Sequence, residues 1–90
     1  MAPQAIEDLN NFKANIRAEV KDAIEKHLRH EPRKISKTRI KRLRGFTRPQ
    51  FRLRVSEVRV FYDVGQSTVE VLAIVDKLAA EEWLERHGER

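Results

Sequence analysis

Two short segments of alternating apolar and polar residues contain the side chains best suited to chemistry. These side chains are Arg52, Arg54, Arg59 and Phe61. A guanidinium group binds phosphate through two parallel hydrogen bonds and stays charged at any relevant pH. An aromatic ring beside it can stack an unpaired base, as recognition of single-stranded RNA often requires. These residue types together predict a surface that binds an RNA backbone.

The alternation also predicts the strands that position these side chains. Apolar residues recur at every second position over 51–55 and again over 58–64, which is typical of half-buried strands. Ser56-Glu57 is a possible tight turn between them. If the strands pair as a hairpin, the three arginines share one face of the sheet. Because neighbouring like charges destabilise a sheet by up to about 1 kcal/mol, a bound anion is expected there.

The rest of the chain predicts an α+β fold. Near the N-terminus, apolar residues recur every three or four positions and predict a helical hairpin with a break near Lys13–Asn15. Val69–Val75 predicts a third, well-covered strand, and Asp76 can cap a last helix. We expect an N-terminal helical hairpin packed on a small antiparallel β-meander, with a short C-terminal helix, in a single domain that spans residues 1–90.

A strongly basic connector joins the helical hairpin to the predicted strands. Between Lys26 and Arg54 there are twelve Lys or Arg residues and a single acid, Glu31. Ile40 and Leu43 are three positions apart and predict one short amphipathic turn. The connector side chains expected to extend the polyanion-binding surface are Lys37, Arg39, Lys41, Arg42 and Arg44.

Simpler interpretations of these bases stay open. The sheet arginines can instead belong to a solvated surface on which they pair with Glu57, Asp63 and Glu70. The charge of the connector can serve solubility alone. The connector continues into the arginine-bearing strands without a gap, which favours one continuous track for a polyanion.

The composition excludes several classes of function. The sequence has no cysteine, which rules out disulfides, thiolate catalysis and the usual zinc frameworks. It contains no glycine-rich phosphate loop and no His/Asp metal-binding cluster, so we expect no metal and no other cofactor. No apolar run approaches the roughly 20 residues that span a bilayer, and the N-terminus has no signal-peptide pattern. We therefore expect a cytoplasmic protein that does not bind a membrane.

Four runs of sequence carry a resemblance to a known family. They are Arg42–Gly45, Phe51–Val55, Val58–Val64 and Val69–Ile74. Together with Ala2–Leu9, which is similar to the start of the family's first helix, they resemble the RelE/ParE superfamily of bacterial toxins. The resemblance runs over almost the whole chain. That family usually has an edge strand before the first helix, and here Met1 leaves no room for it. Either the strand is missing or the sequence starts late.

The resemblance assigns roles to single residues. It places the two strand bases at Arg52 and Arg54, and the phosphate-stabilising arginine at Arg59. It places a basic residue after the last strand at Lys77, which makes Arg54, Arg59 and Lys77 the candidate catalytic residues. RNA cleavage also requires proton transfer. The arginine and tyrosine that the RelE branch carries near its C-terminus correspond here to residues without a transferable proton, Leu78 and Leu84.

The resemblance implies a small toxin that an antitoxin neutralises. Our leading expectation is the RelE-branch activity, ribosome-dependent cleavage of messenger RNA by an endoribonuclease that draws partly on groups of the ribosome. The alternatives are a ParE-like inhibitor of DNA gyrase and a non-catalytic basic module that binds nucleic acid. The expected partners are the ribosome, messenger RNA and a small acidic antitoxin. A partly disordered segment of that antitoxin would fold on the toxin and form a hetero-oligomer.

Overall fold

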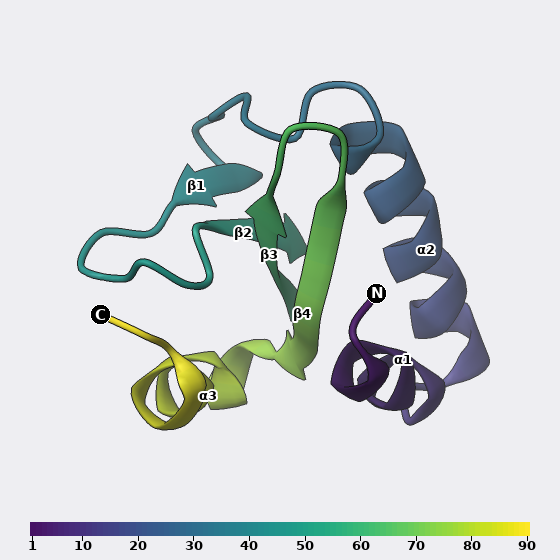
Figure 1. The fold of residues 1–90 in the computed structure, drawn as a ribbon. Coiled ribbons are helices and arrows are strands. Elements are labelled where there is room, and N and C mark those ends of the chain that lie inside the picture. The colour runs from purple at the N-terminus through teal and green to yellow at the C-terminus, as the bar shows by residue number, and fades with distance from the viewer.

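The computed structural model describes residues 1–90. The chain folds into a four-stranded antiparallel sheet with helices on both sides. The helices are α1 (Pro3–Asn10), α2 (Ala14–Leu28) and α3 (Ala80–His87), and a short 3-10 helix, η1 (Lys77–Ala79), precedes α3. The strands are β1 (Ile40–Arg42), β2 (Phe51–Val55), β3 (Val58–Val64) and β4 (Val69–Asp76), paired in that order (Figure 1). None of the helices is long and apolar enough to cross a membrane. The α+β prediction is confirmed.

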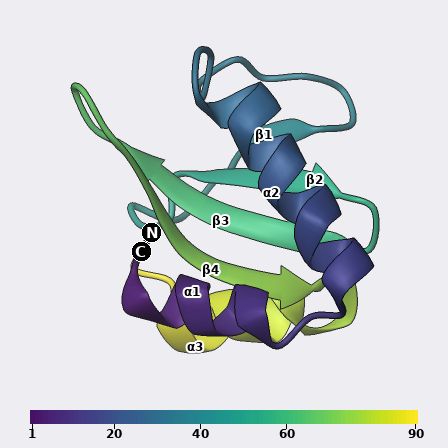
Figure 2. The same ribbon diagram turned by 90° about the vertical axis from the view of Figure 1, so that its right-hand side faces the viewer.

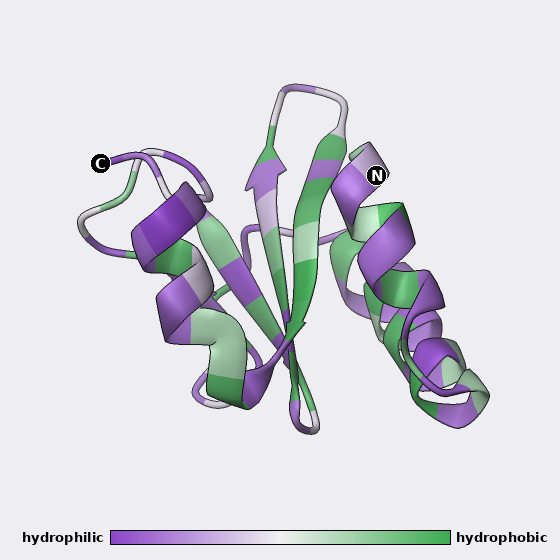
Figure 3. Ribbon diagram, turned by 90° about the horizontal axis from the view of Figure 1, so that it is seen from below, coloured by the Kyte–Doolittle hydropathy of each residue, from purple (hydrophilic) through white to green (hydrophobic).

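The helices form two layers of unequal size. In Figure 2, α1 and α2 both lie in front of the sheet, with α1 along β4 and α2 crossing the other strands. Seen from below in Figure 3, α3 lies on the other side of the sheet from the N-terminal helices. The partly buried Trp83 of α3 packs on Phe61, a residue of this second face.

The main hydrophobic core lies between the sheet and the N-terminal helices. Alternate residues of the strands point into it, and the registers bring Leu53, Val60 and Ile74 into one row across three strands. The helices contribute Ala5, Leu9, Val20 and Leu28, all buried in the same cluster. Tyr62 is also buried in this core. Its hydroxyl donates a hydrogen bond of 2.7 Å to the carbonyl of Pro32, which gives this buried polar group a partner.

The N-terminal residues protect the outer edge of β4. The backbone N–H of Ala2 donates to the Val71 carbonyl at 2.9 Å, and the Asp8 carboxylate accepts from the N–H of Ile74 at 3.0 Å. These contacts satisfy edge groups that would otherwise be free to pair with another chain. The break between α1 and α2 lies at residues 11–13, slightly earlier than the expected break near Lys13–Asn15.

The β2–β3 connection is the two-residue turn that the sequence predicted. Ser56 takes a left-handed φ of 52° at its first position, a conformation that few residues other than glycine adopt easily. Its hydroxyl donates to a carboxylate oxygen of Glu19 at 2.7 Å, so α2 holds the turn from one side. The turn is therefore fixed relative to both the sheet and α2.

The amphipathic turn predicted around Ile40 and Leu43 is wrong, because this segment contains an edge strand. In β1, Ile40 is paired with Leu53 and is buried in the core, whereas Lys41 and Arg42 are exposed. A strand of three residues is too short for its alternation to be distinguished from helical spacing. Its pairing with β2, which the local sequence does not encode, determines its conformation.

The end of β4 follows the prediction. The Asp76 carboxylate accepts a hydrogen bond of 2.9 Å from the N–H of Leu78 and so caps η1, which leads into α3. On α3, the ring of Trp83 stacks on Phe61 with 5.1 Å between the ring centroids and 11° between the ring planes.

Candidate functional site

The three sheet arginines lie on one face, opposite the face that α1 and α2 cover. Arg54 of β2 is directly paired with Arg59 of β3, and Arg52 lies two residues further along β2. We call this surface the arginine face. No carboxylate lies within ion-pair distance of any of these three residues. The alternative in which they pair with acids of their own strands therefore does not hold in this structure.

Arg52 is the least satisfied of the three. Its side chain is half-buried, and its Nε–H is buried without a hydrogen-bond partner in the protein. Burial lowers the pKa of Arg52, and the nearby charges of Arg59 and Arg54 lower it further. A guanidinium that is desolvated, unpaired and close to like charges gains most from an added anion.

Arg59 differs from the exposed guanidinium that the alternation had suggested. It is only 7% exposed, and its Nη1 donates to the carbonyls of Ser56 at 2.9 Å and Val58 at 3.1 Å. These bonds fasten the β2–β3 turn. The predicted role of Arg59 in stabilising a phosphate is therefore limited to its positive charge and to the donors that the turn leaves free.

Arg54 and Lys77 are the accessible bases at the turn end of the arginine face. Both side chains are exposed. The backbone N–H of Lys77 donates to the carbonyl of Glu57 in the turn at 2.7 Å, so the start of η1 lies beside it. The backbone thus brings the three candidate catalytic residues, Arg54, Arg59 and Lys77, to the same end of the sheet.

Phe61 does not offer the exposed ring that we expected for base stacking. It lies on the arginine face, but it is only 1% exposed because Trp83 covers it. The alternation identified its face correctly. It could not show that Trp83 of α3, 22 residues later in the sequence, would pack over that part of the sheet.

The five connector bases are all exposed and lie along the β1 edge of the sheet, but their contacts differ. Lys41 is paired with Arg52 and so extends the arginine face by one strand. The Arg42 guanidinium lies 5.1 Å from the centroid of the Phe51 ring. The Arg39 backbone carbonyl accepts from the N–H of Arg54 at 2.8 Å, which continues the β1–β2 pairing. Lys37 and Arg44 are on the connector on either side of β1.

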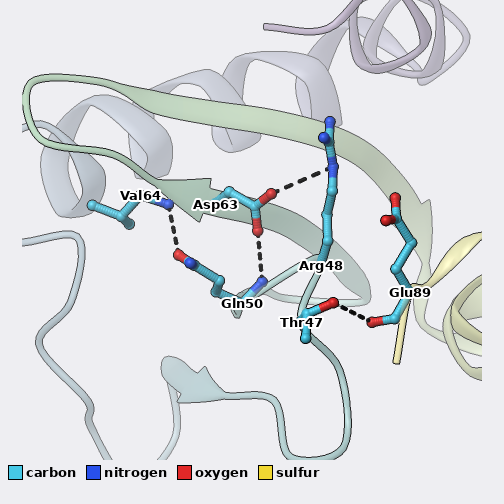
Figure 4. Close-up of polar contacts among 6 residues, drawn as sticks. All are labelled: Thr47, Arg48, Gln50, Asp63, Val64 and Glu89. Carbon is cyan, nitrogen blue, oxygen red and sulfur yellow. Dashed lines mark hydrogen bonds and ion pairs between the residues drawn. The ribbon is translucent and has the colours of Figure 1, made fainter.

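A polar network that the sequence did not reveal holds the β1–β2 loop against the sheet (Figure 4). The Asp63 carboxylate accepts from the N–H of Gln50 at 2.8 Å and lies 3.5 Å from Nε of Arg48. The Gln50 side-chain oxygen accepts from the N–H of Val64 at 3.0 Å. Near the C-terminus, the Glu89 carbonyl accepts from the Thr47 hydroxyl at 3.1 Å. Asp63 is therefore committed to this loop and does not neutralise the arginine face.

Groups that could transfer a proton are scarce on the arginine face. Leu78 is 92% exposed and Leu84 is partly buried, and neither carries a proton that could be transferred. Burial raises the pKa of Tyr62, whose hydroxyl is in the core on the other side of the sheet. The structure also brings together no group of three or more His, Asp or Glu side chains that could hold a metal ion. The arginine face therefore offers positive charge and hydrogen-bond donors but few groups for proton transfer.

Comparison with known proteins places these features in a family. The family model for the "ParE toxin of type II toxin-antitoxin system, parDE" matches residues 1–78, which include all three sheet arginines and Lys77. The fold is similar to a structure described as the RelB-RelE antitoxin-toxin complex from Methanococcus jannaschii, with a TM-score of 0.68. That match has 19% sequence identity and covers 91% of this chain and 94% of that chain, so it shows a shared fold. No curated protein has a matching sequence.

Proposed function

This chain belongs to the family of ParE toxins of type II toxin–antitoxin systems, and we propose that it stops growth by cleaving messenger RNA on the ribosome. The observation that carries this proposal is the unpaired, half-buried guanidinium of Arg52, which lies near two further arginines. An RNA backbone supplies the anion that this arrangement lacks.

The electrostatics of the arginine face support a phosphodiester ligand. Arg52 and Arg54 project from the same face of β2, and Lys41 lies opposite Arg52 on the edge strand. The spacing of such bases along a strand suits successive phosphates of a single-stranded chain, whose binding is largely electrostatic. A basic surface on a small, net-positive protein also speeds encounter with a polyanion such as the ribosome.

The chain's own contribution to cleavage is positioning and charge stabilisation. When a ribose 2′-oxygen attacks the neighbouring phosphorus, negative charge builds up on the non-bridging oxygens. Arg54 can bind those oxygens with two N–H donors, and the positive charge of Arg59 behind it adds to their stabilisation. Lys77 adds a third positive charge at this end of the sheet. An arginine, with a pKa above 12, does not shuttle protons, so proton transfer must come from another group.

Mapping of messages during induced expression tests this proposal. The wild-type chain should arrest growth and produce breaks within the codons of translated messages. Arg54→Ala should reduce the cleavage rate by about 10²-fold or more, which is typical for loss of a group that stabilises transition-state charge. Arg86→Ala is the matched control, because Arg86 is an exposed arginine of α3 that pairs with Glu82 at 2.9 Å. Growth arrest with intact messages would contradict the proposal.

A second candidate function is inhibition of DNA gyrase, as the resemblance to the ParE branch implies. The observation that favours it is the exposed Leu78, which stands where the RelE branch carries a basic residue. An apolar side chain at that position suits contact with a protein target better than contact with RNA. Supercoiling by purified gyrase separates the two functions, because an RNA-cleaving toxin leaves it unchanged. Binding of RNA with neither cleavage nor gyrase inhibition would instead indicate a non-catalytic nucleic-acid-binding module.

We further propose that a small acidic antitoxin neutralises this chain. The exposed basic connector and the arginine face give an acidic segment a large complementary surface. The similar structure is described as a complex of a toxin with its antitoxin. Co-expression with the protein encoded beside this gene should abolish toxicity and yield a complex that dissociates at high salt. Failure of that neighbour to bind would argue against this partner.

A further inference from the structure

A cleft between α2 and the turn end of β2 adjoins the arginine face at Arg54. Its volume is about 520 Å³, within the range of sites that hold a small ligand such as a nucleotide. Its wall on the helix side includes Lys26 and His27, and its opposite wall includes Arg39 and Arg54. The acids Glu19 and Asp22 lie in the same cleft, and Glu19 accepts from the Ser56 hydroxyl.

His27 is the one histidine in this cleft, and it contacts a base of the connector. Its Nε2 lies 2.7 Å from Nη1 of Arg39. Because a guanidinium only donates, Nε2 must accept, and the proton of the neutral ring is on Nδ1. Arg39 is in turn joined through its carbonyl to the N–H of Arg54, which is paired with Arg59. A continuous path of contacts therefore links this imidazole to the arginine face.

We propose that this cleft receives a nucleotide of the RNA and that His27 accepts the proton of its 2′-hydroxyl. This inference rests on the proposed function and supplies the proton acceptor that the arginine face lacks. Arg39 can exchange its contact with His27 for a contact with the RNA phosphate, which frees the lone pair of Nε2. The cleft then holds a base and the phosphate-binding guanidinium of Arg39 around one ribose, with Arg54 at its border with the arginine face.

The step conserves atoms and charge. Nε2 of His27 takes the 2′-hydroxyl proton, the 2′-oxygen bonds to the neighbouring phosphorus, and the bond from phosphorus to the 5′-oxygen breaks. The 5′-oxygen leaves with the bonding electron pair and takes a proton from water, while the imidazolium returns its proton to solvent. The products are a 2′,3′-cyclic phosphate and a 5′-hydroxyl end.

The surroundings of His27 keep it neutral and ready to accept a proton. Burial lowers the pKa of His27, and the charges of Arg39 and Lys26 lower it further, whereas Asp22 raises it. The cleft and the hollow beside it bring further charged and titratable groups around this ring, namely Arg54, Glu19, His30, Glu31 and Lys34. Since the active form is the neutral ring, cleavage should rise with pH through the pKa of His27 and then level off.

Single-turnover cleavage of a message bound to ribosomes tests the proposal. His27→Ala should lower the rate by about 10²- to 10⁴-fold, as loss of a proton acceptor does, and added imidazole should restore part of it. His27→Gln keeps an acceptor for Arg39 but cannot take a proton, so it should be equally slow. His30→Ala, which removes an exposed histidine near the end of α2, should cleave at the wild-type rate.

The outcomes separate the inference from the function on which it rests. If wild type cleaves and His27→Gln cleaves at a similar rate with the same pH profile, His27 only positions Arg39 and the inference is overturned. If wild type itself cleaves no message, the proposed function and the inference fail together. Thermal unfolding of each variant shows whether a slow rate reflects a lost fold. If His27→Ala proves unfolded, His27→Gln decides the question by the same comparison.

Discussion

The two faces of the sheet are built from alternate residues of the same strands, yet they contribute to the protein in opposite ways. On the face covered by α1 and α2, every strand side chain of the central row is apolar and buried. On the arginine face, the like charges of Arg54 and Arg59 are neighbours across β2 and β3, and the buried Nε–H of Arg52 has no hydrogen-bond partner. The first arrangement stabilises the fold, and the second costs stability that a bound anion would restore.

The largest effect on stability is expected on the helix-covered face. Leu53→Ala removes a fully buried side chain at the centre of the core and should lower the free energy of unfolding by about 2–5 kcal/mol. Urea unfolding followed by circular dichroism measures this change. The control is Leu78→Ala, which removes the same side chain at a position that is 92% exposed and should cost less than about 0.5 kcal/mol. Similar losses for both variants would remove the contrast between core and surface.

A large effect on activity without an effect on stability is expected at Arg54. Because its side chain is exposed and makes no ion pair, Arg54→Ala should leave the free energy of unfolding within about 0.5 kcal/mol of wild type. The same change should lower message cleavage by about 10²-fold or more. Parallel urea unfolding and cleavage assays on one preparation check both parts. A stability loss as large as that of Leu53→Ala would place Arg54 in the folding core instead of the site.

A smaller effect, of opposite sign, is expected at Arg52. Arg52→Met keeps an unbranched apolar stem but removes a like charge and a buried donor without a partner. It should raise the free energy of unfolding by about 1 kcal/mol while it weakens RNA binding. Urea unfolding and RNA titration measure the two effects, and Lys41→Met on the neighbouring strand is the exposed control. A destabilised Arg52→Met variant would show that this guanidinium already has a stabilising partner.

The smallest effect is a pH dependence of stability that His27 should cause. Its pKa in the folded chain lies below the usual value of 6.5, so the unfolded chain takes up a proton first as the pH falls. The stability associated with this residue is present above about pH 6.5 and is lost as the pH falls through the folded-state pKa. Comparison of urea unfolding at several pH values should show a flatter curve for His27→Gln. Parallel curves for the two proteins would contradict this assignment.

The sequence predicted the elements whose patterns are local. The helical spacing of the N-terminal residues, the alternation in β2 and β3 and the Asp76 cap all depend on neighbours in the chain. The shared face of the three arginines also followed from alternation once the hairpin was assumed. These features have a period or a cap that can be read without knowledge of the rest of the fold.

The sequence could not predict features that depend on contacts between distant segments. The β1 strand exists because Ile40 pairs with Leu53, and Phe61 is covered because Trp83 packs on it. Arg59 bonds to the carbonyls of its own turn, and the cleft beside His27 forms where α2 meets the end of β2. Alternation determines the face of a side chain, but it does not determine what covers that face.

The salt dependence of RNA binding tests most directly whether the arginine face binds a phosphate backbone. The affinity for a short single-stranded RNA is measured over a range of salt for wild type, the double variant Arg52→Gln with Arg54→Gln, and the control Arg86→Gln. Each phosphate contact contributes roughly −0.7 to the slope of log affinity against log salt, so the double variant should have a slope shallower by roughly 1.4. The control should match wild type. A double variant with the wild-type slope and affinity would contradict the account.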